Sequence, residues 1–195
     1  MSENTYLLIG LGNPGREHKD NRHNVGFMWI DRIAVRLNAQ GMRMQSKSII
    51  TSAVFKDRKL LLAKPQTYMN LSGDSVQSLL RFYKLPMENL LVGHDDLDLP
   101  FGTLRVRPGG GPGGQRGMAS AIEKLGTKDF ARLRIGIGRP PGRMDSAAYV
   151  LQDFSRAEMA DLSAILERAA EAALTFVREG VERTMNKFNG EALDG

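Results

Sequence analysis

A histidine in a polar stretch, Asn21-Arg22-His23-Asn24, is the residue of this chain best suited to acid–base chemistry. Neutral imidazole accepts a proton near neutral pH because its reference pKa is about 6.5. The chain has 3 histidines, and a second one, His18, lies in the same stretch. A loop histidine beside amides and arginine is a candidate general base. A solvated or capping histidine is the plainer interpretation when it is taken alone.

Carboxylates follow an apolar run at His94-Asp95-Asp96-Leu97-Asp98. Ligands of open α/β sheets bind beyond the carboxyl ends of the strands. A carboxylate there can accept a hydrogen bond from one nitrogen of His23, which leaves the other nitrogen free as the base. A solvated turn is the plainer interpretation of the acidic run. A magnesium site is another, and it would need substrate phosphates to complete its shell.

Two asparagines lie at junctions between predicted elements. Gly10-Leu11-Gly12-Asn13-Pro14-Gly15 follows a predicted strand and has the spacing of a dinucleotide-binding fingerprint. The polar stretch after Gly15 has no apolar face, so the helix that the fingerprint requires does not begin there. A tight turn that projects Asn13 fits better, and a nucleotide-cofactor oxidoreductase is a minor alternative. Asn70 lies at a second strand-to-helix junction, where helix capping is its plainer role.

The composition favours an anionic partner and excludes several kinds of site. The 195 residues carry a formal net charge of +5, which suits nucleic acid first, although solubility alone explains such a charge equally well. With 0 cysteines, disulfides, thiolate nucleophiles and cysteine-ligated zinc are excluded. No apolar run approaches the roughly 18 residues that span a bilayer, so we expect no membrane partner and a cytoplasmic or matrix-like location. Arginines that could form a phosphate-binding surface lie near predicted strand ends or glycine loops: Arg105, Arg107, Arg116, Arg132, Arg134, Arg139 and Arg143.

The elements that must position these residues alternate between strand and helix. Apolar runs predict strands at 6–11, 48–55, 59–63, 89–92, 103–107 and 133–137, and helical spacing predicts helices at 25–37, 72–85, 118–125, 155–179 and 181–188. A capping box, Ser155-Arg156-Ala157-Glu158, opens the long C-terminal helix of about 155–179. Residues 1–195 are therefore expected to form one α/β domain, with a twisted mixed sheet and helices on both faces. The segment 138–146, rich in Gly, Pro and Arg, is expected to be a mobile loop.

Five blocks, in order and over about residues 6–189, resemble the bacterial peptidyl-tRNA hydrolase family. They are Gly10-Leu11-Gly12-Asn13-Pro14-Gly15, Arg22-His23-Asn24-Val25-Gly26, Met69-Asn70-Leu71-Ser72-Gly73, His94-Asp95-Asp96-Leu97-Asp98-Leu99-Pro100 and Arg132-Leu133-Arg134-Ile135-Gly136-Ile137-Gly138. The resemblance implies a cytoplasmic monomer with no metal, organic cofactor or obligate protein partner. It implies hydrolysis of the ester between a peptide and the 3′ ribose of tRNA, which recycles tRNA.

The resemblance also implies roles for single residues. His23 resembles the general base that activates water, Asp95 the residue that orients it, and Asn13 the residue that separates peptidyl from free aminoacyl ends. Asn70, with Tyr68 beside it, resembles a substrate-binding residue. Arg107 and Arg134 match basic positions expected to hold tRNA phosphate.

The chain departs from the family at three places. The family usually has tyrosine where this chain has His18, which alters a substrate contact, and threonine where it has Asn21. The glycine loop usually carries His-Asn-Gly, and here it reads Gln115-Arg116-Gly117. Arginine cannot accept a hydrogen bond, so Arg116 is expected to donate to substrate carbonyl or phosphate oxygens, or to a developing oxyanion. The alternative is a non-catalytic RNA-binding homologue of the same fold, against which the intact His23 and Asp95 argue.

Overall fold

The fold is built around one mixed sheet of seven strands, as the computed structural model shows over residues 2–190. The strands are β1 (Thr5–Gly10), β2 (Gln40–Gln45), β3 (Ser48–Phe55), β4 (Arg58–Pro65), β5 (Leu90–Asp96), β6 (Leu104–Arg107) and β7 (Ala131–Gly136), in the order β2-β3-β4-β1-β5-β7-β6. The central strands β4, β1, β5 and β7 run parallel, and β2, β3 and β6 pair antiparallel with their neighbours. The ends of the expected domain, residues 1 and 191–195, lie outside the described residues.

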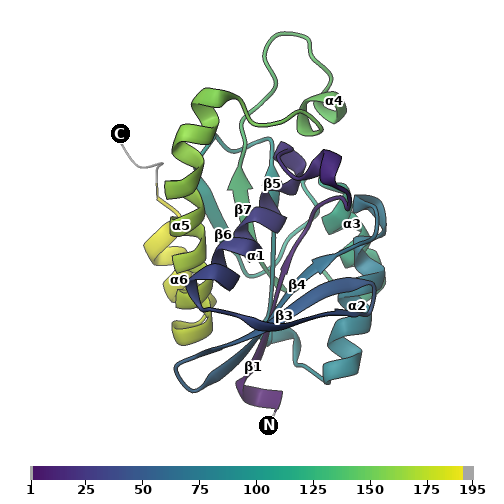
Figure 1. The fold of residues 1–195 in the computed structure, drawn as a ribbon, viewed down its shortest axis with the longest axis vertical. Coiled ribbons are helices and arrows are strands. Elements are labelled where there is room, and N and C mark those ends of the chain that lie inside the picture. Colours follow the sequence, from purple (N-terminus) through teal and green to yellow (C-terminus); the bar gives the residue numbers. More distant parts are fainter. Residues whose placement is uncertain (1, 191–195) are drawn as a thin grey trace.

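Helices cover both faces of this sheet (Figure 1). The α-helices are α1 (Val25–Arg36), α2 (Ser72–Tyr83), α3 (Arg116–Leu125), α4 (Ser146–Val150), α5 (Arg156–Glu179) and α6 (Val181–Phe188). Short 3₁₀ helices are η1 (Ser2–Asn4), η2 (Arg16–His18), η3 (Arg22–Asn24), η4 (Met69–Leu71) and η5 (Met87–Asn89). The predicted α/β class is thereby confirmed.

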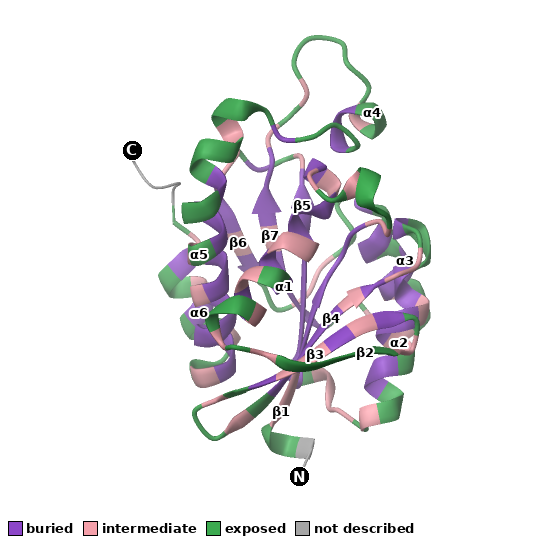
Figure 2. Cartoon of the chain, viewed as in Figure 1, coloured by how far each residue is buried: buried purple, intermediate pink, exposed green. Residues whose placement is uncertain are grey.

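The alternation of side chains along each central strand divides the buried interior into two cores. Leu8 of β1 packs in one core with apolar residues of α1, α5 and α6, and its neighbours Leu7 and Ile9 pack in the other with residues of α2 and α3. Figure 2 shows β5 buried along its length between these layers. Removal of the apolar side chains from water on both faces is the main stabilisation of this arrangement.

Close glycine contacts bring α1 onto the sheet. A Cβ atom at Gly26 would lie 2.5 Å from the carbonyl oxygen of Leu11 and 2.8 Å from that of Gly93. Only glycine permits this approach of helix backbone to strand backbone. Since His23 precedes α1 by two residues, the packing also fixes the histidine near the carboxyl end of β5.

Several predicted boundaries are wrong. Asp95 and Asp96 belong to β5 and are buried, so a solvated turn describes only the exposed Asp98 that follows the strand. β2 was not predicted because its residues are almost all exposed, and α4 was not predicted because it has one turn and follows the loop 138–145. Helix α3 begins at Arg116 instead of near residue 118. After Gly15 the chain enters η2 and not a long helix, which removes the dinucleotide fingerprint.

The C-terminal region closes one edge of the sheet. The predicted capping box at Ser155 and Glu158 is present, and α5 runs to Glu179. After α6, the side chain of Asn189 accepts a hydrogen bond from the Val106 amide nitrogen at 2.6 Å and donates one to the Val106 carbonyl at 2.8 Å. Asn189 thus occupies the free edge of β6 as a neighbouring peptide group would. None of the helices in residues 2–190 is long and apolar enough to cross a membrane.

Candidate active site

A cavity of about 550 Å³ opens beyond the carboxyl ends of the parallel strands. It collects loops that are far apart in the sequence, with η4 on one side and α4 on another. Its walls are formed by Asn13, His23, Tyr68, Met69, Asn70, Asp95, Asp96, Leu97, Gly113, Gly114, Gln115, Arg116, Asp145, Ser146, Ala147, Val150 and Leu151. The position is the one that open α/β sheets use for ligands.

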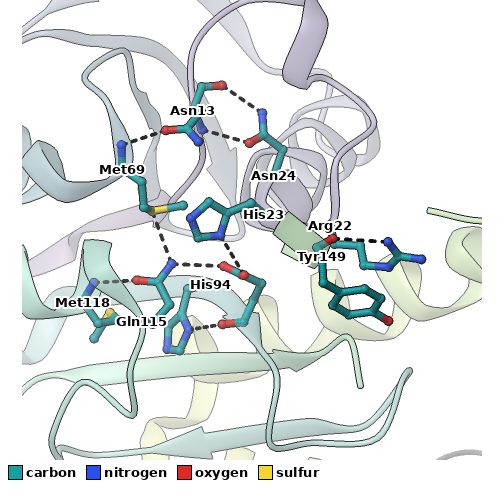
Figure 3. A network of polar contacts seen from close by, with 10 residues as sticks. Asn13, Arg22, His23, Asn24, Met69, His94, Gln115, Met118 and Tyr149 are labelled. Atoms are coloured by element: carbon teal, nitrogen blue, oxygen red, sulfur yellow. Dashed lines mark hydrogen bonds and ion pairs between the residues drawn. The ribbon is translucent and has the colours of Figure 1, made fainter. Parts of the chain in front are cut away.

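His23 and Asp95 form a hydrogen-bonded pair in the wall of this cavity. Figure 3 shows His23 among the polar residues that surround it. The Nδ1 atom of His23 lies 2.8 Å from Oδ2 of Asp95, and their side chains are 12% and 3% exposed. An ionised carboxylate only accepts hydrogen bonds, so it places the proton of neutral His23 on Nδ1. The Nε2 atom, which has no hydrogen-bond partner within residues 2–190, then holds the lone pair of a general base.

A glutamine holds the second oxygen of Asp95. The Nε2 atom of Gln115 donates to Asp95 Oδ1 at 3.0 Å, and its Oε1 atom accepts from the Met118 amide nitrogen at 2.7 Å. The residue is buried and is the N-cap of α3. Sequence reasoning missed this contact, although Gln115 stands at a named departure from the family.

Asn13 is fixed by contacts on all its polar groups except one. Its Oδ1 atom accepts from the Met69 amide nitrogen at 2.8 Å, while its backbone exchanges two hydrogen bonds of 2.9 Å with the side chain of Asn24. Asn24 therefore supports the turn at Asn13 and does not cap α1. The Asn13 side-chain Nδ2 has no partner within the described residues and remains a donor for a ligand.

Tyr68 and Asn70 stand at the rim, on either side of the buried Met69. Tyr68 is 68% exposed. Asn70 lies within η4, and Leu71 precedes α2, so Asn70 does not have the capping role that its position indicated. Both side chains can contact a substrate that enters the cavity.

Arg116 and His18 differ in their relation to the cavity. Arg116 is exposed at the first position of α3, lines the cavity and makes no hydrogen bond or ion pair within residues 2–190. His18 does not line it. Its Nδ1 atom lies 2.8 Å from Oδ1 of Asn21, whose amide nitrogen donates to Asp153.

Arg22, next to His23, fastens the histidine loop to α4 and α5. Its guanidinium donates to Glu158 at 2.8 Å and lies 4.0 Å from the centre of the Tyr149 ring. Burial alone would raise the pKa of Glu158, but hydrogen bonds from Ser155 and Arg22 outweigh it and hold the pKa below its ordinary value. Sequence reasoning assigned Arg22 no role of this kind.

A second, basic cavity of about 400 Å³ lies beside the first and shares Asp96 and Gly113 with it. Arg107, Arg132 and Arg134 line it. Arg107 is exposed and has no polar partner within residues 2–190, whereas Arg134 donates to Asp96 at 2.7 Å. Arg132 is buried against backbone carbonyls of the glycine loop, and burial lowers its pKa to about 10.

Only Arg107, Arg132 and Arg134, of the arginines expected to form a phosphate-binding surface, line this basic cavity. Arg105 donates to the Asn189 carbonyl and Arg139 pairs with Asp98, so neither is drawn into the basic cavity. The acidic residues do not assemble an ion site either. Within residues 2–190, no three His, Asp or Glu side chains gather so that they could hold a metal ion.

The fold and the site define an α/β domain with a histidine–carboxylate pair suited to general-base chemistry, in a cleft beyond its strands. The sequence profile of the peptidyl-tRNA hydrolase family matches residues 7–194, and the chain belongs to that family. It is 45% identical over 190 residues to peptidyl-tRNA hydrolase of Rhodococcus jostii (strain RHA1), covering 97% of this chain and 100% of that one. The enzyme of Mycobacterium tuberculosis (strain ATCC 25177 / H37Ra) is 46% identical over 184 residues, with 94% and 96% covered.

A solved structure shares the fold as well. The crystal structure of peptidyl-tRNA hydrolase from Acinetobacter baumannii superposes with a TM-score of 0.89 at 32% identity, over 98% of this chain and 97% of that chain.

Proposed function

We propose that this chain hydrolyses the ester between the peptide and the 3′ ribose of peptidyl-tRNA, and so recycles tRNA from interrupted translation. The observation that carries the proposal is the His23–Asp95 pair, at 2.8 Å in the wall of a cavity, in a member of the peptidyl-tRNA hydrolase family. The alternative, a homologue that binds RNA without cleaving it, is not favoured, because the pair is intact.

His23 is the general base in this reaction. Its Nε2 atom takes a proton from water, and the resulting hydroxide attacks the ester carbonyl. The tetrahedral intermediate then collapses, and the ribose oxygen leaves with the proton that His23 returns to it. Asp95 keeps the proton of neutral His23 on Nδ1 and stabilises the imidazolium that forms. No step requires a metal ion.

The donors around the cavity bind the reacting end of the substrate. Asn70 and Arg116 donate to the carbonyl oxygen as its charge develops, which is the role of an oxyanion hole. The free amide of Asn13 contacts the peptide and distinguishes it from the charged amine of an aminoacyl end. Tyr68 contacts the substrate at the rim. His18 would reach the substrate only beyond the cavity walls.

Arg107 and Arg134 bind tRNA phosphate in the basic cavity. Arg107 has no polar partner within the described residues to compete with a phosphate, and Arg134 remains partly exposed beside Asp96. A matched test compares Arg107→Ala with Arg43→Ala, since Arg43 is exposed on β2 at the opposite edge of the sheet. Only Arg107→Ala should weaken tRNA binding and reduce the salt slope by about one. Equal effects of the two changes would contradict the phosphate role.

We further propose that residues 1–195 act as one domain, as a monomer without an obligate protein partner, in the cytoplasm. Light scattering of the purified protein measures the monomer, and a single cooperative urea transition tests the single domain. A stable dimer, or two separate transitions, would contradict these proposals.

The decisive test is peptide release from purified N-acetyl-aminoacyl-tRNA in the presence of a metal chelator. The wild-type chain should cleave the ester, and His23→Ala should reduce turnover by about 10²–10⁴-fold while tRNA binding is retained. If His23→Ala keeps more than about a tenth of the turnover, the base assignment is wrong. If the wild-type chain binds tRNA and releases no peptide, the RNA-binding alternative replaces the proposal.

A further inference from the structure

Gln115 connects the histidine–aspartate pair to the first turn of α3. The side chain is 8% exposed and uses both ends of its amide. Its Oε1 atom accepts from the Met118 amide nitrogen at 2.7 Å, and its Nε2 atom donates to Asp95 Oδ1 at 3.0 Å and contacts the Met69 sulfur at 3.3 Å. Figure 3 shows Gln115 with dashed contacts to Met118 and Met69. The row of contacts continues from Gln115 through Asp95 to His23.

The orientation of the amide follows from its partners. The Met118 backbone N–H only donates, so the oxygen of the Gln115 amide must face it. The amide nitrogen is then turned toward Asp95, which as a carboxylate only accepts. Gln115 is uncharged and does not titrate, and its donation to Asp95 is therefore the same at every pH at which the protein is folded.

Asp95 receives one donor on each oxygen. His23 Nδ1 lies 2.8 Å from Oδ2, and Gln115 donates to Oδ1. The two contacts fix the plane of the carboxylate and hold Oδ2 toward the imidazole. Loss of the Gln115 contact leaves the carboxylate free to rotate and leaves an oxygen of the buried Asp95 without its donor, which is costly.

We infer that Gln115 is a positioning residue for the hydrolysis, acting through Asp95 on the orientation and basicity of His23. The inference rests on the proposed function. Gln115 is also one of the positions at which this chain departs from the family pattern.

A purely structural role in capping α3 makes different predictions. Serine is a favoured N-cap residue, and its short hydroxyl can serve the Met118 amide but cannot reach Asp95. Gln115→Ser therefore separates capping from positioning. Gln115→Glu keeps the shape and the cap but replaces the donor to Asp95 with an oxygen, so that two carboxylates face one another.

The experiment is peptide release from N-acetyl-aminoacyl-tRNA between pH 5.5 and 8.5, with urea unfolding of each variant. Gln77→Ser is the matched control, since Gln77 also donates to α3, at the carbonyl of Lys124 near the opposite end. We expect Gln115→Ser to lower kcat by about ten- to hundredfold with KM within about twofold, and the control to stay near wild type.

The dependence of kcat on pH distinguishes positioning from capping, because loss of the cap alone would not change it. Gln115→Glu should lose activity as pH rises, because the shared proton between Glu and Asp95 leaves, and should recover part of it at the acid end. Wild-type kcat and an unchanged pH profile in Gln115→Ser and Gln115→Glu would overturn the inference. If the wild-type chain itself releases no peptide, the proposed function fails instead.

Discussion

Arg22 offers a quantitative test of how the histidine loop is held. Arg22→Met removes a buried ion pair and leaves an apolar stem of similar length over the Tyr149 ring. The charged hydrogen bond to Glu158 at 2.8 Å contributes about 1.5–3 kcal/mol. The guanidinium over Tyr149, at 4.0 Å, contributes about 0.5–1 kcal/mol more. We therefore expect the free energy of unfolding to fall by about 2–4 kcal/mol.

This range is centred about 1 kcal/mol below that of a stranded buried charge, which is roughly 3–5 kcal/mol. The Glu158 carboxylate retains the hydrogen bond that the Ser155 amide nitrogen donates in the capping box, at 2.6 Å. Arg32→Met is the matched control, because its ion pair with Glu167 joins the same helix at the surface and should contribute about 0–1 kcal/mol.

Urea unfolding at pH 7 measures both changes, and peptide release shows whether His23 is displaced. The pKa of Glu158 is lowered in the folded state, so its contribution is present above the ordinary glutamate pKa and is lost as pH falls through the lower folded value. The difference between wild type and Arg22→Met should therefore shrink below about pH 4. If Arg22→Met costs no more than Arg32→Met, the reasoning is refuted.

Three further predictions test the packing, the pH dependence and the cavity. Gly26→Ala brings a methyl group within 2.5 Å of the Leu11 carbonyl oxygen. We therefore expect the free energy of unfolding in urea to decrease by about 1–3 kcal/mol or more. A near-neutral effect would contradict the close packing. Burial lowers the pKa of His94, although the hydrogen bond to the Asp95 carbonyl opposes this. The unfolded chain therefore binds the proton at a higher pH than the folded chain. As the pH is lowered past about 6.5, the free energy of unfolding should decrease by up to about 1.4 kcal/mol per pH unit. His94→Gln should flatten that slope, and an equal slope in both proteins would assign it elsewhere. Arg116→Ala should lower kcat/KM at least about tenfold if the guanidinium meets the developing oxyanion, and unchanged peptide release would exclude that contact.

The sequence predicted the architecture well because its signals are local. Apolar runs and helical spacing found the strands β3 and β4 and the α-helices other than α4, and the capping box at Ser155 marked the start of α5. Edge strand β2 escaped because exposed strands lack the buried alternation that identifies a strand. The start of α3 was predicted near residue 118 instead of at Arg116 because its N-cap is Gln115, and glutamine is not among the favoured N-cap residues.

Site residues could be predicted from the sequence only where the residue type itself indicates a chemical role, as histidine indicates a general base. The contact between His23 and Asp95 was predicted correctly, although a solvated turn was the plainer interpretation of the acidic run. The burial of Asp95 and Asp96 is produced by segments distant in the sequence. Gln115 and Asn24 could not be assigned for the same reason. Their partners, Asp95 and Asn13, come from other elements, and no spacing along the chain announces such contacts.

The amide of Asn189 has a consequence for association between molecules. An unpaired sheet edge is a template onto which a strand of another chain can add. At β6 that template is interrupted at Val106, where an incoming strand would have to displace two hydrogen bonds. The edge that carries Arg107 is thus less available to a strand of another chain than the opposite edge of the sheet, at β2, whose residues are almost all exposed.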